Sequence, residues 1–171
     1  MGPVRDDGWR RATDGSQRAA RRIRRAIERN RRLDRAAWRP VSEHVGRLTD
    51  EIGAVAEAGD TLDRSVALLD PDVLHARLAT FEEQAASEPS PELELAIRAV
   101  ERDLERRRDL LSRSGRARVQ VDRALTRLDD LARRLEDGYG LGEPGSAARV
   151  LDAHTADLAA LRSVLEDVPH P

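Results

Sequence analysis

Eight arginines occupy the fifteen positions of RRIRRAIERNRRLDR, residues 21–35. Their guanidinium groups stay charged and donate several hydrogen bonds, so the chemistry they offer is the binding of carboxylates or phosphates. On a helix, Ile23, Ile27 and Leu33 would lie on one side, with arginines covering the rest of the surface. The residues predicted to bind an anion or a partner are Arg18, Arg21, Arg22, Arg24, Arg25, Arg29, Arg31, Arg32 and Arg35.

Three partners suit this basic helix. Residues 1–40 carry 13 arginines and five acids, whereas the rest of the chain carries 17 arginines and 27 acids. The imbalance favours docking of the helix on its own protein or on a second copy. An anionic membrane surface is the next candidate, although the apolar strip is narrow for a helix lying in a membrane. Nucleic acid is less favoured, because no known recognition module accompanies the charge.

Four polar residues interrupt regular apolar spacings further along the chain: Arg107, Ser114, Arg118 and His154. The first three have two interpretations, a solvated gap in the core or a cluster that pairs with acids and sets the register between helices. For His154, a partly buried register-setting residue is favoured over a pH-sensitive contact, which remains the alternative because imidazole titrates near neutrality.

Signatures of enzymes and cofactors are weak. The run GYGLG at 138–142 follows a helical pattern, not a strand, so it indicates a connection between helices rather than a phosphate-binding loop. None of the four histidines belongs to the Glu-x-x-His motif of di-iron bundles, and the chain has no cysteine for thiolate catalysis or zinc. We expect a non-enzymatic protein with no cofactor, no metal and no small-molecule substrate.

The composition places these residues on helices. Of 171 residues, 36% are charged and 2% aromatic, which is typical of long helices and coiled coils and not of sheet proteins. There is no apolar stretch of signal-peptide type at the N-terminus and none of about 18 residues anywhere. A cytoplasmic location is expected.

The predicted organisation has four parts. A flexible segment covers residues 1–15, and a basic amphipathic helix covers 16–39, because Pro40 disfavours helical backbone at the residue before it. A heptad-patterned helical bundle then covers 40–168, followed by a tail of residues 169–171.

Within the predicted bundle, apolar residues recur at alternating steps of four and three residues. Such seams are typical of helices that pack as coiled coils. They predict an all-α fold, an elongated antiparallel coiled-coil-like bundle of about five helices, one of them very long. The first seam is Val41, Val45, Leu48, Ile52, Val55, Gly59, Leu62, Val66 and Leu69; the second continues from Leu93 through Leu104, Leu111, Leu125 and Leu128 to Tyr139; the third runs from Ala147 through Leu151, Leu158 and Leu165 to Val168.

Two dipeptides mark helix starts: Asp70-Pro71 and Ser90-Pro91 combine a capping side chain with a proline at the first helical position. The longest pattern, residues 91–137, is either one helix or a hairpin that turns at Gly115. One continuous helix is favoured, because a turn would reset the apolar register, and the register is the same on both sides of Gly115.

These patterns predict a scaffold or interaction protein that self-associates through its seams. The helix at 91–137 is longer than its predicted partner at 147–168 can cover, so part of its apolar face is available to another copy or to another helical protein. The alternative is a protein that binds an anionic surface, membrane lipid or nucleic acid, through its arginine-rich helix.

Overall fold

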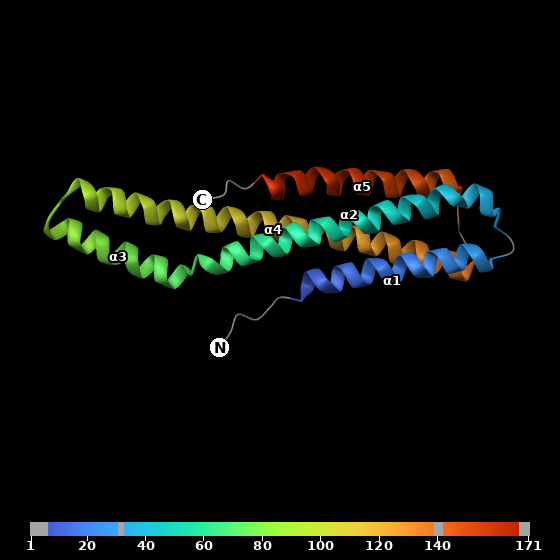
Figure 1. Cartoon of the computed structure of the whole chain (residues 1–171), viewed down its shortest axis with the longest axis horizontal. Helices are drawn as coiled ribbons and strands as arrows, with labels where there is room; N and C mark the ends of the chain where they lie inside the picture. The colour runs from blue at the N-terminus through green and yellow to red at the C-terminus, as the bar shows by residue number, and fades with distance from the viewer. Residues whose placement is uncertain (1–6, 31–32, 139–141, 168–171) are drawn as a thin grey trace. The chain divides into compact units, whose positions relative to one another are not determined.

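The computed structural model describes residues 7–30, 33–138 and 142–167. These residues form helices and connecting turns and contain no strand, which confirms the prediction of an all-α fold. The helices, shown in Figure 1, are α1 (Gly8–Arg29), α2 (Arg35–Leu68), α3 (Pro71–Ser87), α4 (Pro91–Asp137) and α5 (Pro144–Glu166).

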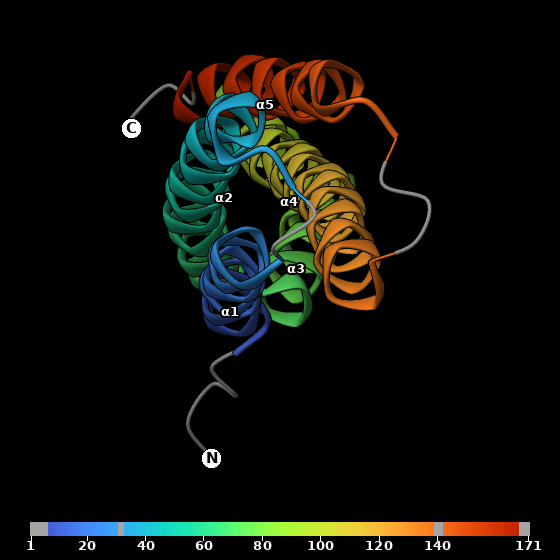
Figure 2. The ribbon, with the colours of Figure 1, turned by 90° about the vertical axis from the view of Figure 1, so that its right-hand side faces the viewer.

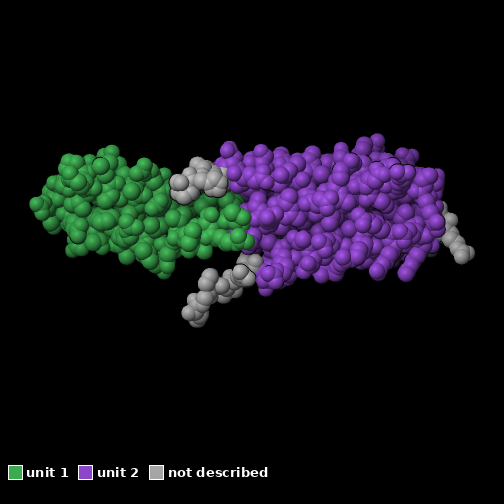
Figure 3. Space-filling model, in the orientation of Figure 1, with its two compact units in different colours: residues 1–3, 61–115 green, residues 4–60, 116–171 purple. Residues whose placement is uncertain are grey.

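The described residues divide into two compact units (Figure 3). Unit 1 contains residues 61–115, which are the end of α2, all of α3 and the first half of α4. Unit 2 contains the described residues up to 60 and from 116 onward, which are α1, most of α2, the second half of α4 and α5.

Unit 2 is a four-helix bundle. Its helices α1 and α4 run in one direction and α2 and α5 in the other (Figure 1), with α1 and α5 on opposite sides of α2 and α4 (Figure 2). The residues that fill its core are apolar and almost fully buried, as expected for helices that each bury one stripe. They include Trp9, Ile23, Ile27, Trp38, Val41, Val45, Leu48, Ile52, Val55, Val121, Leu128, Leu135, Leu151, Leu158 and Leu165.

The start of α1 corrects one prediction. Residues 8–15 are helical, not part of a flexible segment, because Trp9 and Ala12 are buried on the same side of the helix as Ile23. Packing of this face outweighs the low helix propensity of Gly8 and Gly15, which costs only about 1 kcal/mol for each glycine.

The boundary between α1 and α2 is also corrected: α1 ends at Arg29, and α2 begins at Arg35 and includes Pro40. Asp34 caps the new helix, since its Oδ1 accepts a hydrogen bond from the backbone N–H of Ala36 at 2.9 Å. Pro40 lacks the N–H that would bond to the preceding turn, and a proline inside a helix costs about 3 kcal/mol. Burial of Trp38 and Val41 on either side of it offsets this cost.

The long helix is continuous from Pro91 to Asp137, as predicted, and does not turn at Gly115. Most of its buried residues lie on the predicted seam, and the clearest departure is at Leu111. Leu110 is buried, whereas Leu111, the predicted seam residue, is 43% exposed. Beyond this point the predicted register is kept, because Ser114, Val121, Leu128 and Leu135, which are seven residues apart, are all buried.

The capping predictions for α3 and α4 are confirmed. The side chain of Asp70 accepts hydrogen bonds from the backbone of Asp72 and Val73, and Ser90 Oγ accepts one from Leu93 N at 3.2 Å. Helix α5 begins at Pro144 rather than at the predicted Ala147. The predicted seam ends Tyr139 and Val168, and the tail 169–171, lie outside the described residues.

Unit 1 has a much smaller core. Helix α3 and the first half of α4 lie side by side as a helical hairpin (Figure 1). Their cluster consists of three buried residues, Leu74, Val100 and Leu104, with three partly buried neighbours, Leu69, Leu78 and Phe81.

Candidate interaction surfaces

The arginine-rich helix docks through its apolar side. In α1, Ile23 and Ile27 are buried, and small residues such as Ala19 and Ala20 allow close packing beside them. The apolar face is therefore covered by unit 2 and is not available to enter a lipid bilayer. In the described part of the chain, no helix has both the length and the apolar content that crossing a membrane requires.

Arg22 joins α1 to α4 through two carboxylates. Its Nη1 lies 3.2 Å from Asp129 Oδ1, and its Nη2 and Nε lie 2.6 and 3.0 Å from the two carboxylate oxygens of Glu136. The hydrogen bond from Arg22 lowers the pKa of Glu136, and the bond to Glu136 raises the pKa of Arg22. All three side chains are about 40% exposed, so water screens the pairing.

Replacing Glu136 with Gln should reduce the free energy of unfolding at neutral pH by less than about 1 kcal/mol, as for other exposed ion pairs. Because folding lowers the pKa of Glu136, the carboxylate contributes stability above its unfolded pKa and loses it as the pH falls through the folded value. The free energies of unfolding of the two proteins, measured with urea across this pH range, should therefore become equal at acidic pH. A difference that persists unchanged in acid would show that the pair is not its source.

The other predicted arginines of this region remain at the surface. Arg18, Arg21, Arg25 and Arg29 are exposed, and none of them forms an ion pair with another described residue. Arg24 is exposed, with a guanidinium nitrogen beside Gly46 of α2. Arg35 donates from Nη2 to the backbone oxygen of Glu28 at 2.9 Å, and Arg31 and Arg32 lie outside the described residues.

In unit 1, two of the polar residues predicted to lie on the seam bond to α2 or to the turn that follows it. Ser114 is buried, and its Oγ donates a hydrogen bond to Asp63 Oδ1 at 2.6 Å. Arg107 donates from Nε to the backbone oxygen of Leu69 at 2.9 Å, which satisfies a carbonyl just beyond the end of α2. The two partners are 38 residues apart in sequence in the Arg107 bond and 51 residues apart in the Ser114 bond. Together the bonds fix α4 along α2 within unit 1.

The third polar seam residue, Arg118, stacks on Trp9 of α1. Its guanidinium carbon lies 4.9 Å from the ring centroid, a cation–π geometry. Sequence reasoning assigned Trp9 to a flexible segment and gave it no role. The available signal was the spacing of Trp9, Ala12, Ser16, Ala19 and Ile23, which repeats at three or four residues, although small side chains make it faint.

Helix α5 is held to α2 by polar contacts. Arg162 Nε donates to Glu51 Oε1 at 2.7 Å, and this bond raises the pKa of Arg162. His44 Nε2 lies 3.6 Å from Asp152 Oδ1. The predicted register residue His154 is half-buried on the same helix.

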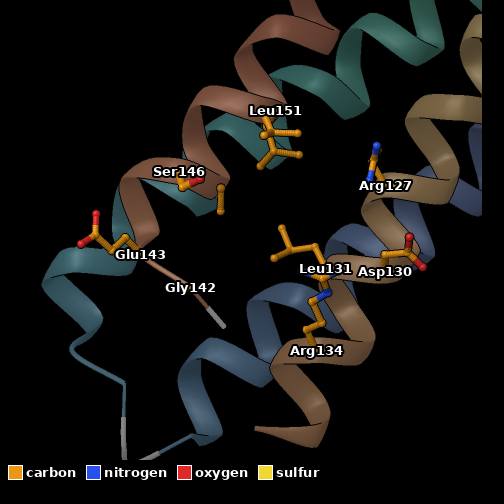
Figure 4. Close-up of a pocket in the computed structure, with 10 residues that line it drawn as sticks. Arg127, Asp130, Leu131, Arg134, Gly142, Glu143, Ser146 and Leu151 are labelled. Atoms are coloured by element: carbon orange, nitrogen blue, oxygen red, sulfur yellow. The ribbon is translucent and has the colours of Figure 1, made fainter. Parts of the chain in front are cut away.

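A pocket of about 210 Å³ lies in unit 2 between the end of α4 and the start of α5 (Figure 4). Leu131 and Leu151 form part of its apolar lining, and Arg127, Asp130 and Glu143 contribute polar groups. Its arginines are solvent-exposed, and both signs of charge are present. We assign it no ligand.

The described residues contain no cluster of three or more histidine, aspartate or glutamate side chains placed to hold a metal ion.

Comparisons with protein-family models, with curated proteins and with solved structures found no match to this chain.

Proposed function

We propose that this protein is a non-enzymatic interaction or scaffold protein that self-associates through the hairpin of unit 1. The observation that carries the proposal is the small core between α3 and α4, a cluster with three buried apolar residues. Helices in proteins gain most of their stability from tertiary packing, and two helices side by side leave much of their apolar faces uncovered. A second pair of helices would cover these faces, as in a four-helix bundle.

The proposed contact follows one line along α4, which we name the hairpin seam, and which includes one residue of the existing core, Leu104: Leu93, Ile97, Leu104 and Leu111. Residues seven or eleven apart lie within about 20° of each other around an α-helix, so these four share one side. Leu104 is buried, Leu93 and Ile97 are half-buried, and Leu111 is 43% exposed. The seam thus continues past the residues that α3 and α2 cover.

The charges favour a second copy in the antiparallel orientation. Residues 81–101, at the turn of the hairpin, contain six acids and one arginine, whereas residues 102–115 contain five arginines and three acids. Parallel pairing would place two acidic ends together, and like charges in contact are repulsive. Antiparallel pairing places each acidic end beside the other copy's basic segment. The product would be a coiled-coil-like antiparallel four-helix bundle with two-fold symmetry.

Light scattering coupled to size-exclusion chromatography tests the proposal. We expect the full chain to be a dimer, Leu111→Glu to be a monomer of unchanged helicity, and Leu95→Glu to stay dimeric. Leu95 is the matched control, because it is also an exposed leucine of α4 but lies half a turn away from Leu104. A monomeric wild type at all concentrations would exclude self-association, and equal effects of the two variants would exclude the seam.

The orientation has its own experiment, made possible because the chain has no cysteine. Ser87→Cys places a thiol at the turn of the hairpin, and Arg108→Cys places one near its other end. Antiparallel pairing predicts disulfide-linked dimers in a mixture of the two variants. Efficient cross-linking of Ser87→Cys alone would indicate parallel pairing and overturn the orientation while leaving self-association in place.

A further inference from the structure

We infer that the exposed side of α1 binds the phosphate backbone of double-stranded nucleic acid without sequence preference. The site is a row of four arginines, Arg18, Arg21, Arg25 and Arg29, hereafter the arginine row. They recur at steps of three, four and four residues and therefore lie along one side of the helix. The row is about 16 Å long at a rise of 1.5 Å per residue.

The arginine row is held at the surface by the packing of α1, and its members form no ion pair with another described residue. The opposite side of α1 is buried through Ile23 and Ile27, so the helix is anchored with these side chains pointing to solvent. Arg22, on the flank of the same helix, is already bonded to Glu136. Like charges three or four residues apart on a helix repel one another. An anion along the row would relieve that repulsion.

Duplex phosphates match the row better than other anions do. Each strand of a duplex carries one negative charge per about 3.4 Å of the axis, so a 16 Å row can meet several phosphates of one strand. Membrane binding requires an apolar face that inserts, and that face of α1 is buried in unit 2. Single strands are bound by stacking on exposed aromatic rings, whereas Trp9 and Trp38 are 4% and 3% exposed.

Acidic residues limit the strength of the site. Asp14 and Glu28 are exposed on the same side of α1, and the chain as a whole has a net charge of −2. At physiological salt, charges more than about 8 Å apart are largely screened, so the local row decides the contact. Binding should therefore be weak and depend strongly on salt.

The experiment measures the fluorescence anisotropy of a labelled 30-base-pair DNA duplex of random sequence, titrated with the full chain at several salt concentrations. Four phosphate contacts predict a slope of about −3.6 for log K against log salt, which is roughly a 100-fold loss of affinity between 50 and 200 mM. Changing the four row arginines to Gln should lower affinity at least tenfold at 50 mM salt. Helicity should be unchanged, because the substitutions remove repulsion from an exposed face.

The matched control changes Arg123, Arg127, Arg133 and Arg149 to Gln, which alters the net charge equally at exposed positions of α4 and α5. This variant should lose less than threefold. Equal losses in the two variants would show a diffuse charge effect and overturn the site. An absence of duplex binding at 50 mM salt would also overturn the site. Binding to phosphatidylserine vesicles without binding to the duplex would overturn it as well and would identify a membrane-surface contact. The outcome is independent of the self-association proposed for unit 1.

Discussion

Replacing Gly59 with Ala should destabilise unit 2 by about 1–3 kcal/mol, the cost of overfilling a packed site. In an ordinary helix this change is stabilising, because glycine costs about 1 kcal/mol relative to alanine. Here a Cβ at position 59 would lie less than 3.0 Å from three atoms of the Trp9 indole. Gly59 is buried on the face of α2 that meets α1, and the ring is 4% exposed, so neither side can yield without moving a helix.

Gly53→Ala is the control, because a Cβ at position 53 meets nothing within 4 Å. It should stabilise the protein by about 0.5–1 kcal/mol. Urea unfolding followed by tryptophan fluorescence is the measurement, since both tryptophans belong to unit 2. In a Trp9→Leu background the penalty of Gly59→Ala should largely disappear. If Gly59→Ala were as stabilising as Gly53→Ala, the close approach of α1 to α2 would be wrong.

Leu128→Asp should abolish cooperative folding of unit 2. The side chain of Leu128 is fully buried in the four-helix core. Losing a buried leucine costs about 2–5 kcal/mol, and burying a carboxylate without a partner adds several more. Together these approach the whole stability of a typical domain, about 5–15 kcal/mol. Circular dichroism should show reduced helicity at pH 7, and tryptophan fluorescence should show exposed indoles.

The defect should be milder in acid. A buried aspartate has a raised folded pKa, so the variant gains stability as the pH falls and the carboxyl is protonated in both states. Val119→Asp provides the comparison, because Val119 lies on the same helix and is 51% exposed. It should change the free energy of unfolding by less than about 0.5 kcal/mol, as do most surface substitutions. Cooperative unfolding of Leu128→Asp at wild-type urea concentrations would contradict the placement of this residue in the core.

The helices and many of their limits follow from local rules. Asp70-Pro71 and Ser90-Pro91 start α3 and α4 because a capping side chain and a fixed proline φ act within one turn. The apolar spacing from Val41 to Val55 identifies the buried face of α2 in unit 2, because these residues are all buried in its core. The continuity of α4 through Gly115 follows from a single glycine costing little in a long helix.

Other predictions failed because the deciding contacts are distant in sequence. Trp9 makes residues 8–15 helical by packing against α2, and Gly59 is small because Trp9 occupies the space beside it. For neither residue does the local sequence pattern predict the residue that it contacts. The predicted seam position at Leu111 was wrong because Leu110 is the buried residue there, although the seam from Ser114 to Leu135 keeps the predicted register.

The arginine-rich stretch illustrates the division most clearly. By itself, the sequence determined that an amphipathic helix with a dense positive charge is present, since composition and spacing suffice for that. The tertiary structure decided which charges are used: Arg22 bonds to Asp129 and Glu136, more than 100 residues away, while the arginine row remains in solvent. The physical reason is that helix propensity and amphipathic spacing depend on residues within a few positions of one another. The pairing of a charge depends on which surface the chain brings beside it.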